Sequence, residues 1–133
     1  MKIIKILLCL FFMIAMAFSA YADGSELVTK IDAVVSQGPE NGNYFVGAND
    51  VYMWLKMKKT DFVVVDVRIG ENAINAYKSA HIPGAIYIPY NEIFKSENLQ
   101  KLPKDKKIIF VCHMGASESL LIVPLRMLGY DAY

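Results

Sequence analysis

Two continuous apolar runs constrain the fold of this 133-residue chain more than any other feature. Phe62–Val65 lies between Asp61 and Asp66, and Ile108–Val111 runs directly into Cys112. An apolar run without alternation is typical of a strand that is buried on both faces, as in a parallel sheet. Helical patterns separate and follow these runs, so the sequence predicts an α/β domain with a mostly parallel central sheet.

The other expected elements alternate with these strands. The sequence predicts helices within residues 26–35, 49–59, 71–80, 90–96 and 117–128, and strands within residues 44–47, 61–68, 86–89 and 107–112. Asn49 is expected to cap the second of these helices, and Gly129 to end the last one. Residues 81–85 are expected to form a turn.

The first 22 residues predict the cellular compartment of the mature protein. Lys2 and Lys5 precede a long apolar segment that ends in Ala20-Tyr21-Ala22, the pattern of a secretory signal peptide cleaved after Ala22. An uncleaved anchor is the alternative, but the segment is at the low end of the about 20 residues that span a bilayer. We therefore expect a periplasmic or secreted protein that touches the membrane only through this peptide, before cleavage.

The balance of charges and the number of cysteines limit the classes of function that the chain can have. The chain has 14 basic and 13 acidic residues, a balance that does not suggest nucleic acid as a partner. Residues 23–43 are polar and are expected to form a linker and irregular lead-in, and residues 44–133 the domain. Cys9 would leave with the signal peptide, so the thiol of Cys112 is free and reactive, paired with another chain, or buried and inert.

The local pattern around Cys112 favours a reactive thiol. A strand ends at Cys112, a turn contains Gly115, and a helix follows near Ser117. The unpaired amide groups at a helix N-terminus bind anions and favour a thiolate over a thiol. In α/β folds this carboxyl end of a strand is also where ligands usually bind. A small buried hydrophobic residue is the alternative interpretation.

From about residue 62 to 133, the chain resembles the rhodanese-like (sulfurtransferase) domain family. The resemblance rests on Asp66-Val67-Arg68, His81–Ala85, Leu102–Asp105, the loop after Cys112 and Leu128-Gly129-Tyr130, in that order. It implies a three-layer α/β fold. Family members usually continue past this point into another strand, so the domain is expected to be C-terminally truncated and to lack that strand.

The resemblance implies a sulfurtransferase that works through a persulfide on Cys112. A small sulfur-containing anion, such as thiosulfate or polysulfide, would donate sulfur, and a thiol or cyanide would accept it. The implied substrate-binding loop is His113, Met114, Gly115, Ala116 and Ser117. No metal or organic cofactor is implied, and a homodimer is left open.

Three positions depart from the family pattern. Many members have Arg directly after the cysteine and Arg or Thr four residues later, where this chain has His113 and Ser117. Glu118 stands where related phosphatases need Arg, which argues against phosphoryl chemistry. The loop is therefore short of positive charge, which favours polysulfide over thiosulfate. Ser117 is expected to donate a hydrogen bond to the substrate and to cap the helix.

Three charged residues are expected to act as structural supports. These are Asp66 and Arg68, which would pair at a strand end, and His81, which would fix a loop. Cys112 and His113 alone do not predict a metal site. The alternative function is a non-catalytic rhodanese-like binding module or a degenerate truncated domain.

Overall fold

The computed structural model describes residues 24–133, so the signal peptide predicted at residues 1–22 lies outside the described part. The chain divides into two compact units. The first ends at Ala33, and the second runs from Val34 to Tyr133. A helix covers residues 24–35, which confirms the helix predicted within residues 26–35. Within the described residues, no helix has both the length and the apolar character needed to cross a membrane.

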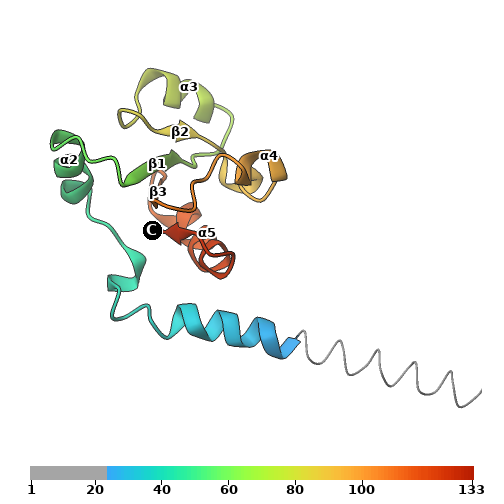
Figure 1. Cartoon of the computed structure of the whole chain (residues 1–133). Helices are drawn as coiled ribbons and strands as arrows, with labels where there is room; N and C mark the ends of the chain where they lie inside the picture. Colours follow the sequence, from blue (N-terminus) through green and yellow to red (C-terminus); the bar gives the residue numbers. More distant parts are fainter. Residues whose placement is uncertain (1–23) are drawn as a thin grey trace, which may run out of the picture. The chain divides into compact units, whose positions relative to one another are not determined.

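A four-stranded parallel sheet forms the centre of the second unit, as predicted (Figure 1). The strand order is β2-β1-β3-β4, so β1 (Phe62–Asp66) and β3 (Lys107–Val111) are the two inner strands. They pair along their whole length, with Val65 opposite Phe110. β2 (Ile86–Tyr87) pairs with β1 on the outer side. The two apolar runs of the sequence are therefore the two central strands.

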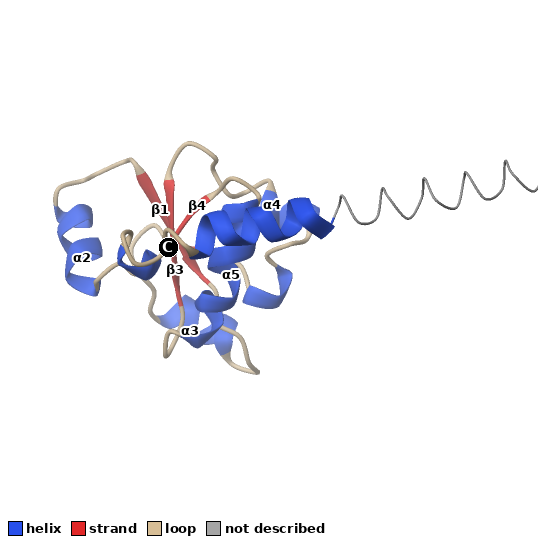
Figure 2. Cartoon of the chain, turned by 90° about the horizontal axis from the view of Figure 1, so that it is seen from below, coloured by secondary structure: helices blue, strands red, loops and turns tan. Residues whose placement is uncertain are grey.

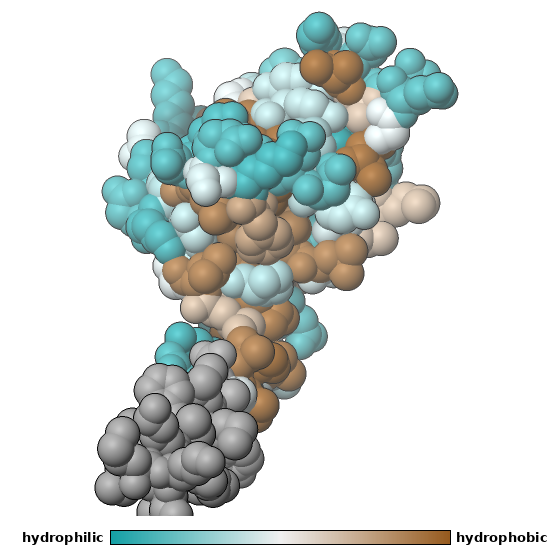
Figure 3. All heavy atoms as spheres, turned by 90° about the vertical axis from the view of Figure 1, so that its right-hand side faces the viewer, coloured by the Kyte–Doolittle hydropathy of each residue, from teal (hydrophilic) through white to brown (hydrophobic). Residues whose placement is uncertain are grey.

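Helices cover both faces of this sheet, which gives the expected three layers (Figure 2). On one face, α2 (Ala48–Lys56) and α3 (Ala73–Ser79) pack against Val64 and Ile109. The other face carries the larger core, built on Val65, Ile108 and Phe110. It is covered by η2 (Tyr90–Glu92), α4 (Ser96–Leu99) and α5 (Ala116–Met127). On the outer surface, apolar side chains (brown) lie among hydrophilic ones (teal) in Figure 3.

The last residues of the chain form β4 (Asp131–Ala132), a strand that the sequence patterns did not predict. β4 pairs in parallel with the first part of β3. The ladder continues through Tyr133, whose N–H donates to Ile108 O and whose C=O accepts from Phe110 N, both at 2.8 Å. The side of β3 that faces away from β1 is therefore paired from Lys107 to Phe110.

Two predictions for residues 44–49 are wrong. Residues 44–47 do not form a strand, because Gly42–Tyr44 is a 3-10 turn (η1) in which Asn43 and Tyr44 have positive φ. Left-handed backbone cannot continue a strand. Asn49 does not cap α2, because the helix already begins at Ala48 after the extended Gly47, which is the N-cap.

The helix predicted after Cys112 is confirmed as α5, which runs through Pro124. It ends before Gly129, whose φ of +80° is left-handed, as expected for a glycine that stops a helix. Ser117 does not cap this helix. The N-cap is Gly115, and Ser117 lies inside the first turn.

Candidate active site

Cys112 lies directly after β3, where the chain leaves the carboxyl end of an inner strand. Its side chain is half-buried and packs against the larger core. The chain then turns through Gly115, whose φ is +80°, and enters α5 at Ala116. A non-glycine residue would be strained at this φ, so the turn that brings the helix back over the thiol depends on glycine.

Two backbone amide groups point at the sulfur of Cys112. The N–H of Gly115 lies 3.1 Å from Sγ and the N–H of Met114 lies 3.4 Å from it, measured from nitrogen to sulfur. These amides precede a helix of 12 residues, whose N-terminus carries partial positive charge. Both place partial positive charge beside the sulfur, where it can stabilise an anionic group attached to Sγ.

A cavity of about 700 Å³ opens beside this thiol. Its walls come from the lead-in residues 43–48, α2, the turn after α3, β3, the loop after Cys112, α5 and Tyr133. Most of the lining is apolar. Of the predicted loop residues, Met114 and Gly115 line the cavity with Cys112, whereas His113, Ala116 and Ser117 do not. The structure thus brings part of the predicted site together.

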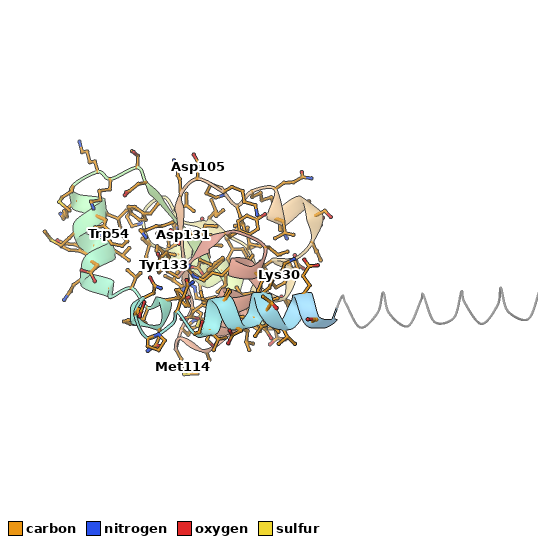
Figure 4. All side chains as sticks on the ribbon, turned by 60° about the horizontal axis from the view of Figure 1, so that its bottom comes forward. Lys30, Trp54, Asp105, Met114, Asp131 and Tyr133 are labelled. Atoms are coloured by element: carbon orange, nitrogen blue, oxygen red, sulfur yellow. The ribbon has the colours of Figure 1, made fainter. Side chains whose placement is uncertain are left out.

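The loop side chains supply little fixed charge to this cavity. His113 is exposed, and Met114 is 88 % exposed and points away from the domain (Figure 4). Among the described residues that line the cavity there is no Lys, Arg or His. Backbone amides, rather than cationic side chains, therefore provide the electropositive environment of Cys112.

Glu118 is a cavity residue that the sequence did not assign to the site. It lies in the first turn of α5, and one of its carboxylate oxygens, Oε2, is buried without a hydrogen-bond partner among the described residues. The other oxygen lies near the turn, since a Cβ added to Gly115 would be 3.5 Å from Oε1. Its position six residues after Cys112 is visible in the sequence, but its unpaired state is not.

Asp66 and Arg68 form a close ion pair at the end of β1. Nη2 of Arg68 donates to Oδ2 of Asp66 at 2.6 Å, and Nε donates to both carboxylate oxygens. Arg68 also donates to Ala80 O at 3.0 Å and so ties β1 to the end of α3. The hydrogen bonds that Arg68 donates to Asp66 are the main cause that raises the pKa of Arg68 above its usual value. Asp66 is opposite Val111, the residue before Cys112, so the pair adjoins the site.

His81 lies in the turn that directly follows α3 and its C-cap, Ala80. Its Nδ1 lies 2.7 Å from Tyr77 O, and its ring stacks on the Tyr77 ring with centroids 4.2 Å apart. The Tyr77 hydroxyl in turn donates to Ala85 O. These contacts hold the turn that begins at His81, and Ile82 and Pro83 of the same turn line the cavity. His81 itself does not line it.

Tyr87 completes this support. Its hydroxyl donates to Arg68 O at 3.1 Å, so β2 holds the chain just after β1. Burial is the main cause that raises the pKa of Tyr87 above its usual value.

No three described His, Cys, Asp or Glu side chains gather in a way that could hold a metal ion.

Comparison with known proteins agrees with this architecture. The family model of the rhodanese-like domain matches residues 49–133. Over 67 residues the chain is 31 % identical to the "Putative sulfur carrier protein YrkF" of Bacillus subtilis, a match that covers 50 % of this chain and 33 % of that protein. The chain thus spans about a third of the length of this relative.

Two solved structures are similar over most of the domain. The BH2092 protein of Bacillus halodurans has a TM-score of 0.60 and 26 % identity, covering 76 % of this chain and 72 % of that one. A rhodanese-like domain protein of Staphylococcus aureus has a TM-score of 0.52 and 25 % identity, covering 63 % and 76 %.

Proposed function

Because the chain belongs to the rhodanese-like domain family, we propose that it is a sulfurtransferase that carries sulfane sulfur on Cys112. One observation carries the proposal: the amides of Met114 and Gly115 both point at Sγ of Cys112. The arrangement supports a sulfur nucleophile and also an anion attached to it.

In the first half-reaction, the Cys112 thiolate attacks the outer sulfur of the donor. A new S–S bond forms at Sγ, and an S–S bond of the donor breaks. The donor leaves one sulfur atom shorter and takes the electron pair of the broken bond. Cys112 becomes a persulfide anion, Cys–S–S⁻, whose charge the loop amides stabilise.

In the second half-reaction, an acceptor thiolate attacks the outer sulfur of this persulfide. The bond between the two persulfide sulfurs breaks, and its electron pair returns to Sγ as the Cys112 thiolate. The same amides that hold the persulfide then hold the leaving thiolate, so one set of preorganised donors serves both steps.

Polysulfide is the proposed donor. Thiosulfate carries two negative charges, and cationic side chains normally offset such charge in a binding site. The described residues around this cavity offer Glu118 and no Lys, Arg or His. Polysulfide has no oxyanion group, and its weakly hydrated sulfur chain suits the mainly apolar lining better than the sulfonate end of thiosulfate does.

Mass spectrometry of the purified protein tests the proposal. Incubation with polysulfide is expected to add about 32 Da, one sulfur atom, to the Cys112 peptide. Cys112→Ser should show no gain, and thiosulfate should load the wild type more slowly than polysulfide. An unmodified Cys112 after polysulfide treatment would contradict the proposal.

We also propose that the protein acts outside the cytoplasm, on the basis of residues 1–22. N-terminal sequencing of the protein from the producing cell should then begin at Asp23. Ala22→Leu removes the small residue before the cleavage site and should block processing, whereas Ser25→Leu should not. A wild-type protein that retains residues 1–22 and fractionates with the cytoplasm would contradict this location.

A further inference from the structure

A basic edge lies at the end of the domain opposite the thiol. The parallel strands β1 and β3 both begin at this end, and the chain enters them through residues 56–61 and 104–106. These two segments, which define the basic edge, lie side by side because the N–H of Lys107 donates to Asp61 O at 3.0 Å. Their lysines are Lys56, Lys58, Lys59, Lys104 and Lys106.

Ion pairs do not neutralise these lysines. Among the ion pairs of the described residues, none includes any of the five. The two segments contain two acids, Asp61 and Asp105, so the basic edge is positive overall. Lys104 is held against the end of α5, since it donates to Leu128 O. The ammonium groups of the other four are not committed to a carboxylate.

Exposed methionines accompany the lysines on the outer side of α2. Met53 is 52 % exposed and Met57 is 57 % exposed, and both share a helix face with Lys56. Neither methionine lines the cavity beside Cys112, so this face is separate from that open space. Apolar side chains and lysines on one exposed helix face are typical of a surface that lies in a lipid interface.

Trp54 joins this helix to the start of β1. Its half-buried ring packs edge-on against Phe62, with centroids 5.4 Å apart, and Nζ of Lys59 lies 5.5 Å from the ring centre. An indole ring between an apolar layer and an ammonium group suits the boundary between lipid and water. Trp54 is also the one tryptophan of the sequence.

Lys58 has a backbone conformation that usually belongs to glycine. Its φ is +53°, directly after the C-cap of α2. At the equivalent position after α5 the chain has Gly129, with a φ of +80°. A lysine is strained in this left-handed conformation and glycine is not. Folding alone therefore does not account for a lysine at this position.

From these features, we infer that the basic edge, together with Met53 and Met57, docks on a membrane surface that contains anionic phospholipid. The lysines attract the headgroups and keep their ammonium groups in water while their stems lie along apolar surface. The methionines supply the apolar side chains that enter the interface. A soluble polyanion would pair with the lysines but would leave the methionines in water.

Docking at this end leaves the thiol accessible. Cys112 follows the opposite end of β3, and Figure 4 shows Asp105 and Met114 at opposite ends of the domain. The contact is separate from the one expected for residues 1–22. Net charge does not indicate it, because the chain has 14 basic and 13 acidic residues and the lysines gather only in the fold.

The fluorescence of Trp54 tests docking at the surface itself. Protein purified from the producing cell is mixed with phosphatidylcholine vesicles, with and without about one-third phosphatidylglycerol. Some of the lipid carries a spin label on its headgroup, which quenches a nearby indole ring. Anionic vesicles should quench Trp54 and neutral vesicles should not, and high salt should weaken the effect. Attachment through residues 1–22 does not by itself bring Trp54 to the headgroups.

Lys58→Gly separates docking from folding. Glycine relieves the left-handed backbone, so the melting temperature should not fall. The affinity for anionic vesicles should nevertheless fall about fivefold, the effect of one lysine near such a surface. Met57→Ser should lower the affinity by about fivefold through lost apolar burial. Lys78→Gln, which removes an exposed lysine of α3 outside the basic edge, is the matched control and should leave the affinity unchanged.

The inference is overturned if anionic vesicles do not quench Trp54, if neutral vesicles quench it equally, or if Lys58→Gly binds like the wild type. It is also overturned if soluble polyglutamate shifts the Trp54 emission as strongly as anionic vesicles do, because the partner would then be a soluble polyanion. None of these results depends on sulfur transfer at Cys112, so they leave the proposed function to its own test.

Discussion

The backbone N–H of Gly115 donates to Sγ of Cys112 at 3.1 Å. The contact exists because Gly115 has a φ of +80°, which turns the chain at the N-terminus of α5. A single backbone conformation thus links the turn, the start of the helix and the environment of the thiol.

Gly115→Ala tests this link. The added Cβ meets only an ordinary contact, Glu118 Oε1 at 3.5 Å, so the main cost is the left-handed backbone. We expect the free energy of unfolding to fall by about 1 kcal/mol. The alkylation rate of Cys112 by iodoacetamide at neutral pH should also fall by about fivefold, because the amide no longer points well at the sulfur.

Gly84→Ala is the matched control. Gly84 also has a φ of +80°, and an added Cβ there meets no atom within 4 Å. This variant should lose a similar free energy of unfolding while Cys112 reacts at the wild-type rate. Equal alkylation rates in the two variants would contradict the role of the Gly115 amide.

Removing the charge of Asp66 should destabilise the domain. The side chains of Arg68 and Asp66 are only 16 % and 3 % exposed, so Asp66→Asn leaves a largely buried guanidinium without its anion. We expect a loss of about 3 kcal/mol in the free energy of unfolding, measured by urea denaturation.

Glu92→Gln provides the contrast for the ion pair. Glu92 and Lys95 form a pair whose side chains are 41 % and 52 % exposed, and solvent screens such pairs. Its loss should cost less than about 0.5 kcal/mol. Similar losses in Asp66→Asn and Glu92→Gln would contradict the structural role of the buried pair.

Two adjacent leucines of α5 test which side of this helix packs on the sheet. Leu121 is 2 % exposed and belongs to the larger core, whereas Leu120 is 64 % exposed. Leu121→Ala should lower the free energy of unfolding by about 3 kcal/mol, because it leaves a cavity in the core. Leu120→Ala should change it by less than about 0.5 kcal/mol. The reverse order in urea denaturation would contradict the orientation of α5.

The inner strands and the helices beside them could be predicted from the sequence because their signals are local. The run Phe62–Val65 and the run before Cys112 indicate buried strands without any knowledge of their partners. Gly129 likewise marks the end of α5 by its own conformational freedom. The position of Cys112, between the end of a strand and the start of a helix, follows from the predicted strand before it and the predicted helix after it.

The remaining features depend on contacts that are distant in the sequence. β4 is only two residues long, and it is a strand because Tyr133 and its neighbours pair with β3. Residues 44–47 have the apolar composition of a strand, but Tyr44 instead turns back, and its hydroxyl donates to Val34 O at 2.6 Å. Such pairings leave little trace in local composition.

Glu118 shows the same limit within the site. Its place in the first turn suits the helix dipole, and the sequence gives no further sign of its role. Only the assembled cavity shows that its Oε2 is buried without a partner and that no Lys, Arg or His of the described residues lines the same space.

The central claim is that Cys112 both takes up and gives away sulfane sulfur, and the mass of the Cys112 peptide through one cycle tests it most directly. Polysulfide should add about 32 Da, and a thiol acceptor added after removal of the donor should return the peptide to its original mass. The acceptor should gain the same sulfur as a persulfide, and Cys112→Ser should show neither step. A Cys112 that is never loaded, or a loaded Cys112 that yields no sulfur to a thiol, would contradict the account.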